Sequence, residues 1–242
     1  MSSSNPSPSS SGSNRELAAS LSQSSFRLVL ASQSPRRRAL LREDGYRFAT
    51  IPAAECIEKY ANAPLDSPCD YVRTLATLKA QNVAARLCGR VSVARWDVSP
   101  ALPGSAPFLV VGCDSVAVCN DEILGKPRDR EDAERMLRAL SGSVHRVVTG
   151  LALWRVDAQD YASGPYVEKL ETRVESSSLE MEELGEARLA YYLDSGLWEG
   201  KAGAFGYQDG NDWLKLIEGT ESNVVGLPLE ALADSILARF SH

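Results

Sequence analysis

Histidine is nearly missing from this sequence, which limits the chemistry that the chain can support. His145 and His242 are the only two histidines among 242 residues. A zinc site with three His ligands is therefore excluded, and a Ser–His–Asp triad would depend on His145 alone. Catalysis by this chain would have to use carboxylates, lysines, arginines and a bound metal ion.

Long hydrophobic runs and an excess of basic residues are also missing. No apolar run approaches the roughly 18–20 residues that a membrane span needs, and residues 1–25 hold no apolar segment typical of a secretory signal. The formal net charge is −6, whereas a general nucleic-acid binder normally has a basic face. We expect neither a membrane nor a nucleic acid as a partner, although a few cationic side chains can still form a pocket for a small anion.

The cysteines do not form a disulfide or zinc pattern. There are five of them, an odd number, and none belongs to a CxxC pair. Because disulfides persist mainly in oxidising compartments, we expect reduced and packed thiols. Together with the missing signal segment, this predicts a cytoplasmic protein.

The beginning of the chain differs in composition from the rest. Twelve of the first 25 residues are Ser, and such a segment has little apolar surface to offset the entropy of ordering. We therefore predict a disordered tail over 1–25 and one folded domain over 26–242. Residues 89–107 lack a clear period and are predicted to be an inserted loop.

Strand and helix signals alternate irregularly over the folded domain. Strands are predicted at 26–31, 108–119, 144–156, 166–175 and 213–217, with a short partner strand after the turn at 120–121. Helices are predicted at 34–45, 67–88, 129–142, 228–240 and, from a capping box at Ser177 and Glu180, up to Gly196. The irregular order predicts an α/β fold with a mixed central sheet flanked by helices.

The segment ASQSPRR at 31–37 combines two serines with two arginines where a strand passes into a helix. The free N–H groups and positive dipole of a helix start favour an anion. The guanidinium groups of Arg36 and Arg37 donate paired hydrogen bonds of the kind that phosphate oxygens accept. The alternative is an ordinary capped helix whose arginines face water.

Asp114 is an acidic residue within the apolar strand sequence VVGCDSVAV. It shares a strand face with Val110, Val116 and Val118, where an unpaired carboxylate is costly to bury. It must therefore be paired, bound to a metal or used in catalysis, as a base toward water or as a ligand of Mg²⁺. The alternative is a strand-end Asp that is hydrogen-bonded to the backbone.

Three further features are weaker on their own. Lys79 lies on the apolar stripe of the predicted helix 67–88, where a lysine usually extends its ammonium group to the edge of the stripe. Lys126 leaves a hairpin end between a Gly and a Pro. Residues 201–210 read KAGAFGYQDG, a loop whose backbone can approach a ligand closely, and the amide of Gln208 can read a base edge. A plain flexible connector is the alternative for this loop.

Five blocks of sequence, in the same order, resemble the Maf family of nucleotide pyrophosphatases, relatives of the inosine-triphosphate pyrophosphatase fold. The blocks read LVLASQSPRRRALL, LATLKA, VVGCDSVAV with LGKPRD, LSGSVHRVVTG, and GKAGAFGYQDG followed by NVVGLPLEAL. They extend from about Phe26 to Phe240. The tail and the insertion have no counterpart in compact family members. The resemblance implies the mixed-sheet α/β fold of this family.

The resemblance also assigns roles to residues. It implies that Asp114 is the proton acceptor. The phosphate and substrate contacts that it implies are Ser32, Arg36, Arg37, Lys79 and Lys126. Family members that prefer dTTP and UTP carry Arg, a small hydroxyl residue and Gln at three positions that here are Arg36, Ser115 and Gln208. Members that act on 7-methyl-GTP carry Trp and Gln at the first two, and Ser115 stands where Thr is usual.

The resemblance implies a divalent cation, Mg²⁺ or Mn²⁺, but not its ligands. After Phe48 the family often shows an Asp-Glu pair, and this sequence instead reads IPAAECIEKY. Glu55 and Glu58 are candidates to replace that pair, and the metal ligands stay unassigned.

The expected activity is hydrolysis of a nucleoside triphosphate, dTTP or UTP, to the monophosphate and pyrophosphate, with sanitation of the nucleotide pool as the role. The alternatives are a 7-methyl-GTP pyrophosphatase, a non-catalytic nucleotide-binding regulator of cell division, and a general phosphomonoesterase that would release orthophosphate. A homodimer is left open as the assembly.

Overall fold

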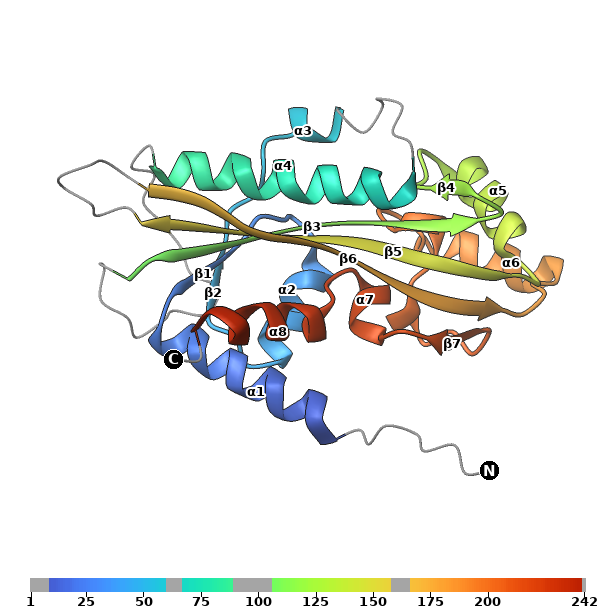
Figure 1. Ribbon diagram of the computed structural model, residues 1–242. Helices are drawn as coiled ribbons and strands as arrows, with labels where there is room; N and C mark the ends of the chain where they lie inside the picture. The colour runs from blue at the N-terminus through green and yellow to red at the C-terminus, as the bar shows by residue number, and fades with distance from the viewer. Residues whose placement is uncertain (1–8, 60–66, 89–105, 158–165, 241–242) are drawn as a thin grey trace.

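A computed structural model describes residues 9–59, 67–88, 106–157 and 166–240 of the protein. A central sheet runs through the long axis of the molecule, and helices lie on both of its faces (Figure 1). The predicted inserted loop at 89–107 falls almost entirely outside the described residues. None of the helices in the described ranges has the length and apolar content that a membrane span requires.

The described part of the chain forms one mixed sheet of seven strands in the order β2-β1-β3-β5-β6-β7, with β4 paired to β3. The strands are β1 Arg27–Leu30, β2 Phe48–Thr50, β3 Phe108–Cys119, β4 Glu122–Leu124, β5 Val144–Asp157, β6 Tyr166–Met181 and β7 Leu214–Glu218. β1 runs parallel to β2 and β3, and the other pairings are antiparallel. The predicted α/β fold with a mixed central sheet is confirmed.

The helices agree with most of the predicted ranges. They are α1 Ser9–Ser24, α2 Pro35–Glu43, α3 Cys56–Lys59, α4 Pro68–Cys88, α5 Arg130–Leu140, α6 Glu186–Asp194, α7 Glu221–Val225 and α8 Leu229–Phe240. The short elements β2, α3 and α7 were not predicted, because three to five residues carry too little periodicity to identify.

α4 covers one face of the sheet at very short range (Figure 1). Two glycines on neighbouring strands make this possible. A Cβ atom on Gly112 of β3 would lie 2.3 Å from the carbonyl oxygen of Ala76, and one on Gly150 of β5 would lie 2.2 Å from that of Val72. The helix backbone therefore lies directly on the strands, which fixes α4 relative to β3.

On the opposite face, the prediction that residues 1–25 are disordered is wrong for α1, which packs beside α8 (Figure 1). Ala18 and Ala19 are buried in the core with apolar side chains of α8. The hydroxyl of Ser22 donates to the carbonyl of Ala19 at 2.6 Å and accepts from the N–H of Arg47 at 3.1 Å. Small side chains allow close helix packing, and buried serine is tolerated where its hydroxyl is bonded, so a Ser-rich composition did not prevent folding.

Ion pairs add to this contact between α1 and the body of the protein. Arg15 of α1 pairs with Asp44, just after α2, and with Glu230 in the first turn of α8. Glu230 in turn accepts a 2.5 Å hydrogen bond from the hydroxyl of Ser222 in α7. The helix α1 is thus tied to the end of α2 and to α8, and through Glu230 to α7.

The helix predicted from a capping box at Ser177 and Glu180 does not begin there, because these residues belong to β6. They pair with Val147 and Val144 of β5, and β7 pairs with the same end of β6 on its other side. Backbone pairing with two neighbours outweighs a local helix signal of this kind. The helix α6 starts only at Glu186.

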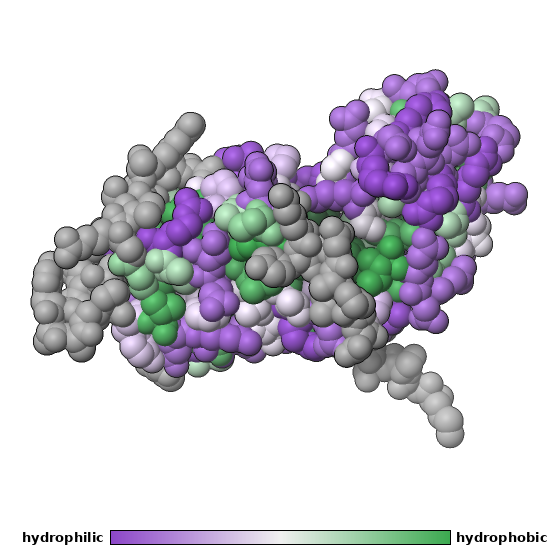
Figure 2. Space-filling view, turned by 90° about the horizontal axis from the view of Figure 1, so that it is seen from above, coloured by the Kyte–Doolittle hydropathy of each residue, from purple (hydrophilic) through white to green (hydrophobic). Residues whose placement is uncertain are grey.

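α5 and α6 form the far end of the molecule, and here the prediction that Asp129 caps a helix is confirmed. Its carboxylate accepts a hydrogen bond from the N–H of Asp132 at 2.8 Å. Figure 2 shows this end as a largely hydrophilic surface. Arg138 contributes to it by pairing with Glu134 and Glu186, which joins the two helices.

A gap in strand pairing along β3 positions the site. On one edge, residues 108–111 of β3 pair with β1 and residues 117–119 pair with β4. Between these pairings, the described part of the chain places no strand against residues 112–116. Arg37, in the first turn of α2, reaches this gap with its side chain instead and bonds to Cys113 and Ser115.

Candidate active site

The gap along β3 opens into a cavity of about 680 Å³, which is large enough for a nucleotide. All residues predicted for the site line it, namely Ser32, Arg36, Arg37, Lys79, Asp114, Ser115, Lys126 and Gln208. They come from segments far apart in sequence, and the sheet and its two helical layers bring them together. The ligand roles that the resemblance implies for them stay predictions.

Asp114 and Lys79 form the centre of the cavity. Asp114 and Ser115 are the only residues of β3 that are not buried. Lys79 Nζ lies 2.6 Å from Asp114 Oδ1, and the two side chains are 10% and 14% exposed. The prediction that Lys79 lies on the apolar stripe of α4 is confirmed, and its ammonium group is paired with Asp114. The pair explains how Asp114 is accommodated on an apolar strand face.

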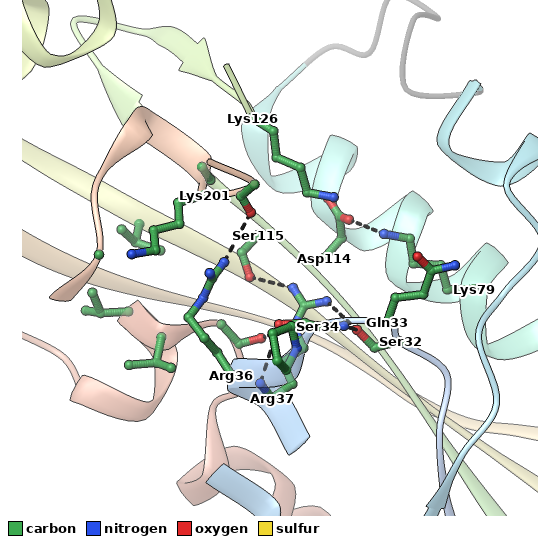
Figure 3. Close-up of a pocket in the computed structure, with 18 of the residues that line it drawn as sticks. Ser32, Gln33, Ser34, Arg36, Arg37, Lys79, Asp114, Ser115, Lys126 and Lys201 are labelled. Atoms are coloured by element: carbon green, nitrogen blue, oxygen red, sulfur yellow. Dashed lines mark hydrogen bonds and ion pairs between the residues drawn. The ribbon is translucent and has the colours of Figure 1, made fainter. Parts of the chain in front are cut away.

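Lys126 approaches the same carboxylate from another side. It follows β4 in the segment that leaves the hairpin, and Figure 3 shows its ammonium group directed toward Asp114. Two cationic groups from different elements therefore face one carboxylate. A negatively charged ligand placed here would meet both ammonium groups.

Arg37 is used to build the wall of the cavity. Its Nη1 donates to the carbonyl of Cys113 at 2.9 Å and to Ser32 Oγ at 3.2 Å, and its Nη2 donates to Ser115 Oγ at 3.1 Å. Its Nε donates to the carbonyl of Gly226 at 2.6 Å. The guanidinium thus closes the gap along β3 and keeps a positive charge at the cavity wall.

The predicted helix start is also confirmed. The hydroxyl of Ser34 accepts from the N–H of Arg37, and Pro35 occupies the first turn of α2. Ser32, which is 6% exposed, accepts a hydrogen bond from the N–H of Ser34 at 3.2 Å in addition to that from Arg37. Because the oxygen of Ser32 accepts two hydrogen bonds, its own proton can donate to a ligand oxygen.

Ser115 belongs to a hydrogen-bonded chain below the cavity. Its Oγ lies 2.9 Å from Oγ1 of the fully buried Thr149, and this oxygen also lies 3.2 Å from the carbonyl of Asn223. A hydroxyl carries one proton, so when Thr149 donates to the carbonyl, Ser115 donates to Thr149. Thr149 was not predicted, and its only sequence signal is its position in the strand block LSGSVHRVVTG.

Arg36 lines the cavity next to the glycine-rich loop, where its Nη2 donates to the carbonyl of Gly200 at 3.2 Å. Burial lowers the pKa of Arg36 and its neighbour Arg37 lowers it further, whereas Asp209 raises it. The group remains a cation at physiological pH, since an arginine pKa starts far above this range. Arg36 therefore adds a positive charge close to the glycine-rich loop.

An ion pair in the glycine-rich loop was missed from the sequence. Lys201 lines the cavity, and its Nζ lies 2.5 Å from Asp209. The sequence signal was available, because opposite charges stand at the two ends of the segment KAGAFGYQDG. Sequence alone does not show that the loop folds back so that its ends meet.

The carboxylates that line the cavity are Glu55, Asp114 and Glu199. Among the described residues, no group of three His, Cys, Asp or Glu side chains is arranged to hold a metal ion. Mg²⁺ commonly uses only one or two protein carboxylates and takes its other ligands from substrate phosphates and water. The donor set therefore fits a metal that enters with a polyphosphate. The side chain of Glu58, the other predicted candidate, lies outside the described residues.

The sequence model of a family described as Maf-like protein matches residues 27–239, which include every side chain that lines this cavity. The chain belongs to the Maf family. A dTTP/UTP pyrophosphatase of Rhodopirellula baltica is 43% identical over 220 residues, which cover 90% of this chain and 85% of the relative. A dTTP/UTP pyrophosphatase of Acetivibrio thermocellus is 39% identical over 209 residues, covering 86% and 92%. One of Geobacter sp. (strain M21) is 37% identical over 210 residues, covering 86% and 93%.

Two further titratable side chains of this Maf protein, those of His145 and Cys113, are buried and do not line the cavity. His145 is 2% exposed and packs edge-on against Phe205, with ring centroids 5.2 Å apart. Burial lowers the pKa of His145 to about 4, so it is neutral at physiological pH. Burial likewise raises the pKa of the Cys113 thiol to about 11, which keeps it protonated, as expected for a packed thiol. Neither group offers a base or a nucleophile.

Proposed function

We propose that this Maf protein hydrolyses dTTP and UTP to the nucleoside monophosphate and pyrophosphate and thereby removes nucleotides from the pool. The observation that carries the proposal is the position of Asp114. It is a carboxylate within a cavity otherwise rich in cationic groups, beside Lys79 and close to the chain that leaves β1. A protein that only held phosphates would have no use for this negative charge. The names of the relatives support the choice of substrate.

In the proposed reaction, the cationic side chains hold the triphosphate and Asp114 accepts a proton from a water molecule. The water oxygen attacks the α-phosphorus, and the bond from that phosphorus to the bridging oxygen of the β-phosphate breaks. Pyrophosphate leaves with its charge neutralised by Lys126 and the arginines. Catalysis of this type relies on positioning and on electrostatic stabilisation of the charge that develops on the phosphates.

A divalent cation, Mg²⁺ or Mn²⁺, is part of the proposal. Glu55 is the carboxylate of the cavity wall that would hold it, together with oxygens of the substrate phosphates. When bound with the substrate, such an ion neutralises phosphate charge and polarises the phosphoryl oxygens. Lys79 keeps one oxygen of Asp114 engaged, so the other oxygen remains the one that can meet a ligand.

The preference for dTTP and UTP rests on the base side of the cavity. Gln208 lines this side and carries an amide that donates and accepts, as the O4 and N3–H edge of thymine and uracil requires. Ser115 and Arg36 line the same cavity from β3 and α2. A base whose edge mismatches leaves buried polar groups unpaired and is disfavoured. The expected compartment is the cytoplasm, in agreement with five free thiols.

A nucleotide panel tests the proposal. The protein is incubated with dTTP, UTP, CTP, GTP and 7-methyl-GTP plus Mg²⁺, and both products are identified by ion-exchange chromatography. We expect monophosphate and pyrophosphate, with kcat/KM highest for dTTP and UTP. Orthophosphate as the first product would indicate a phosphomonoesterase. Tight binding without turnover would indicate a regulator, and a preference for 7-methyl-GTP would overturn the base assignment alone.

A further inference from the structure

The glycine-rich loop that carries Gln208 is fastened at both ends by a shielded ion pair. Lys201 Nζ lies 2.5 Å from each carboxylate oxygen of Asp209. The side chains are only 10% and 11% exposed, unlike the exposed ion pairs on α5 and α6. An ion pair held in a less polar environment is stronger than one in water, so it can hold the loop in one shape. The loop is therefore not a flexible connector.

A hydroxyl from α6 joins this pair to the loop backbone. Tyr192 Oη donates to Asp209 Oδ2 at 2.7 Å and accepts from the backbone N–H of Gly206 at 3.1 Å. The amide of Asn211 donates to the carbonyl of Gly206 at 3.1 Å. Both backbone groups of Gly206 are thus fixed from outside the turn. Burial raises the pKa of Tyr192 and the bond to Asp209 raises it further, so the hydroxyl keeps the proton that it donates.

The packing around Gly206 leaves little freedom for another loop shape. A Cβ atom at this position would lie 2.3 Å from an oxygen of Asp209 and 2.5 Å from Lys201 Nζ. Gly203, Ala204 and Gly210 adopt φ values of +70°, +61° and +75°. A non-glycine residue such as Ala204 adopts such a conformation only where its surroundings impose it.

We propose that Asp209, held by Lys201 and Tyr192, is a positioning residue for base selection. It fixes the turn Tyr207–Asp209 and thereby keeps the amide of Gln208 in place at the cavity wall. A Gln on a mobile loop could turn its amide to suit several bases, whereas a fixed Gln leaves a mismatched base with unpaired groups. The inference rests on the proposed function, since it assumes that Gln208 faces a nucleobase.

Asp209 has a second effect through its charge. It neutralises Lys201 and lies near enough to Arg36 to raise the pKa of that group. Without the carboxylate, an additional unneutralised ammonium group would line the cavity. Such a charge attracts the phosphates of every nucleotide equally. Nucleotides with a mismatched base would therefore bind more tightly, and discrimination between bases would be lost.

The experiment compares Asp209→Asn with the wild type and uses Asp209→Glu as the conservative variant. Asp194→Asn is the matched control, because it removes a carboxylate that pairs with Arg130 at 2.6 Å on the exposed side of α6. The affinities for UMP and GMP are measured by calorimetry, kcat/KM for UTP and GTP by pyrophosphate release, and folding by thermal melting. Tyr192→Phe is a second variant that removes only the hydroxyl.

We expect the ratio of UMP to GMP affinity to fall by about tenfold or more in Asp209→Asn, on the scale of one mispaired polar group. Asp209→Glu should restore most of the ratio, Tyr192→Phe should lower it, and Asp194→Asn should leave it unchanged. An unchanged ratio in folded Asp209→Asn, or an equal loss for both nucleotides, would overturn the inference. If the wild type selects UMP yet releases no pyrophosphate, the proposed function fails and the binding ratios still test this inference.

Discussion

Arg37 donates a 2.6 Å hydrogen bond from Nε to the carbonyl of Gly226, which lies 189 residues further along the chain. The same guanidinium bonds to β3 at Cys113 and Ser115. One side chain of α2 therefore joins the central strand to the turn after α7. Arg37 contributes to the shape of the cavity as well as to its charge.

Because Arg37 contributes to both the shape and the charge of the cavity, we predict that Arg37→Lys will lower both stability and activity. A lysine keeps the charge but cannot make four hydrogen bonds in a planar arrangement, so backbone carbonyls lose their donors. A buried unsatisfied group costs about 1–3 kcal/mol, which corresponds to a fall in Tm of roughly 2–12 °C for a chain of this size. Thermal melting and kcat/KM for UTP check the prediction.

Arg36→Lys is the matched control for that experiment. Arg36 donates a hydrogen bond to the carbonyl of Gly200, so its replacement should lower kcat/KM with little change in Tm. An equal fall in Tm in Arg37→Lys and Arg36→Lys would show that Arg37 contributes no more to stability than Arg36.

Asp114→Asn is expected to lower turnover of the preferred nucleotide by about 10²-fold or more, the scale of a lost general base or metal carboxylate. The variant should still fold, because an amide can accept from Lys79 in place of the carboxylate. Turnover and melting are measured together. Asp121→Asn serves as the control, since this exposed turn residue has a φ of +62°, which Asn adopts readily. Turnover near that of the wild type in Asp114→Asn would remove this residue from the mechanism.

The packing of α1 predicts a strong difference between two neighbouring substitutions. Ala18 is fully buried against α8, whereas Ser20 is exposed. Ala18→Glu would bury a charge and overfill the contact, and we expect Tm to fall by several degrees. Ser20→Glu adds the same side chain on the water side and should leave Tm within about 1 °C, as expected for surface changes. Equal melting of the two variants would show that α1 does not contribute to stability.

His145 predicts a loss of stability on acidification. Its pKa is about 4 in the folded protein, below the usual 6.5, so the unfolded chain takes up the proton first as the pH falls. Stability is unaffected above pH 6.5 and declines as the pH drops from 6.5 toward 4, by up to about 3 kcal/mol for this group. Urea unfolding of the wild type and of His145→Phe at a series of pH values measures the difference. Two parallel curves would contradict the assignment, because carboxylates titrate in both proteins alike.

The elements that frame the cavity were predicted because their signals are local. The strand 108–119 is a long apolar run, and α2 begins with a Ser cap followed by Pro. The predictions for Lys79 and Asp114 followed from a charged residue on an apolar stripe or strand face. Such a residue must find a partner, and each proved to be the partner of the other. Sequence alone could not pair them, since they lie on different elements.

The errors occurred where distant segments decide the structure. The residues from Ser177 to Met181 satisfy a helix-start pattern, but β5 and β7 on either side make them a strand. The beginning of the chain reads as disordered by composition, but α8 offers a surface onto which Ala18 fits. Thr149 and the contact between Lys201 and Asp209 depend on three-dimensional proximity that no local spacing contains.

The interruption along β3 also bears on how the protein avoids aggregation. A bare strand edge invites the edge of another molecule to pair with it, and natural proteins usually block such edges with charged side chains or with covering segments. Here Asp114 and Ser115 of the unpaired stretch line the cavity, and the guanidinium of Arg37 already occupies the carbonyl of Cys113. The protein can therefore present two side chains of an unpaired strand edge to a small ligand while keeping that edge closed to an incoming polypeptide.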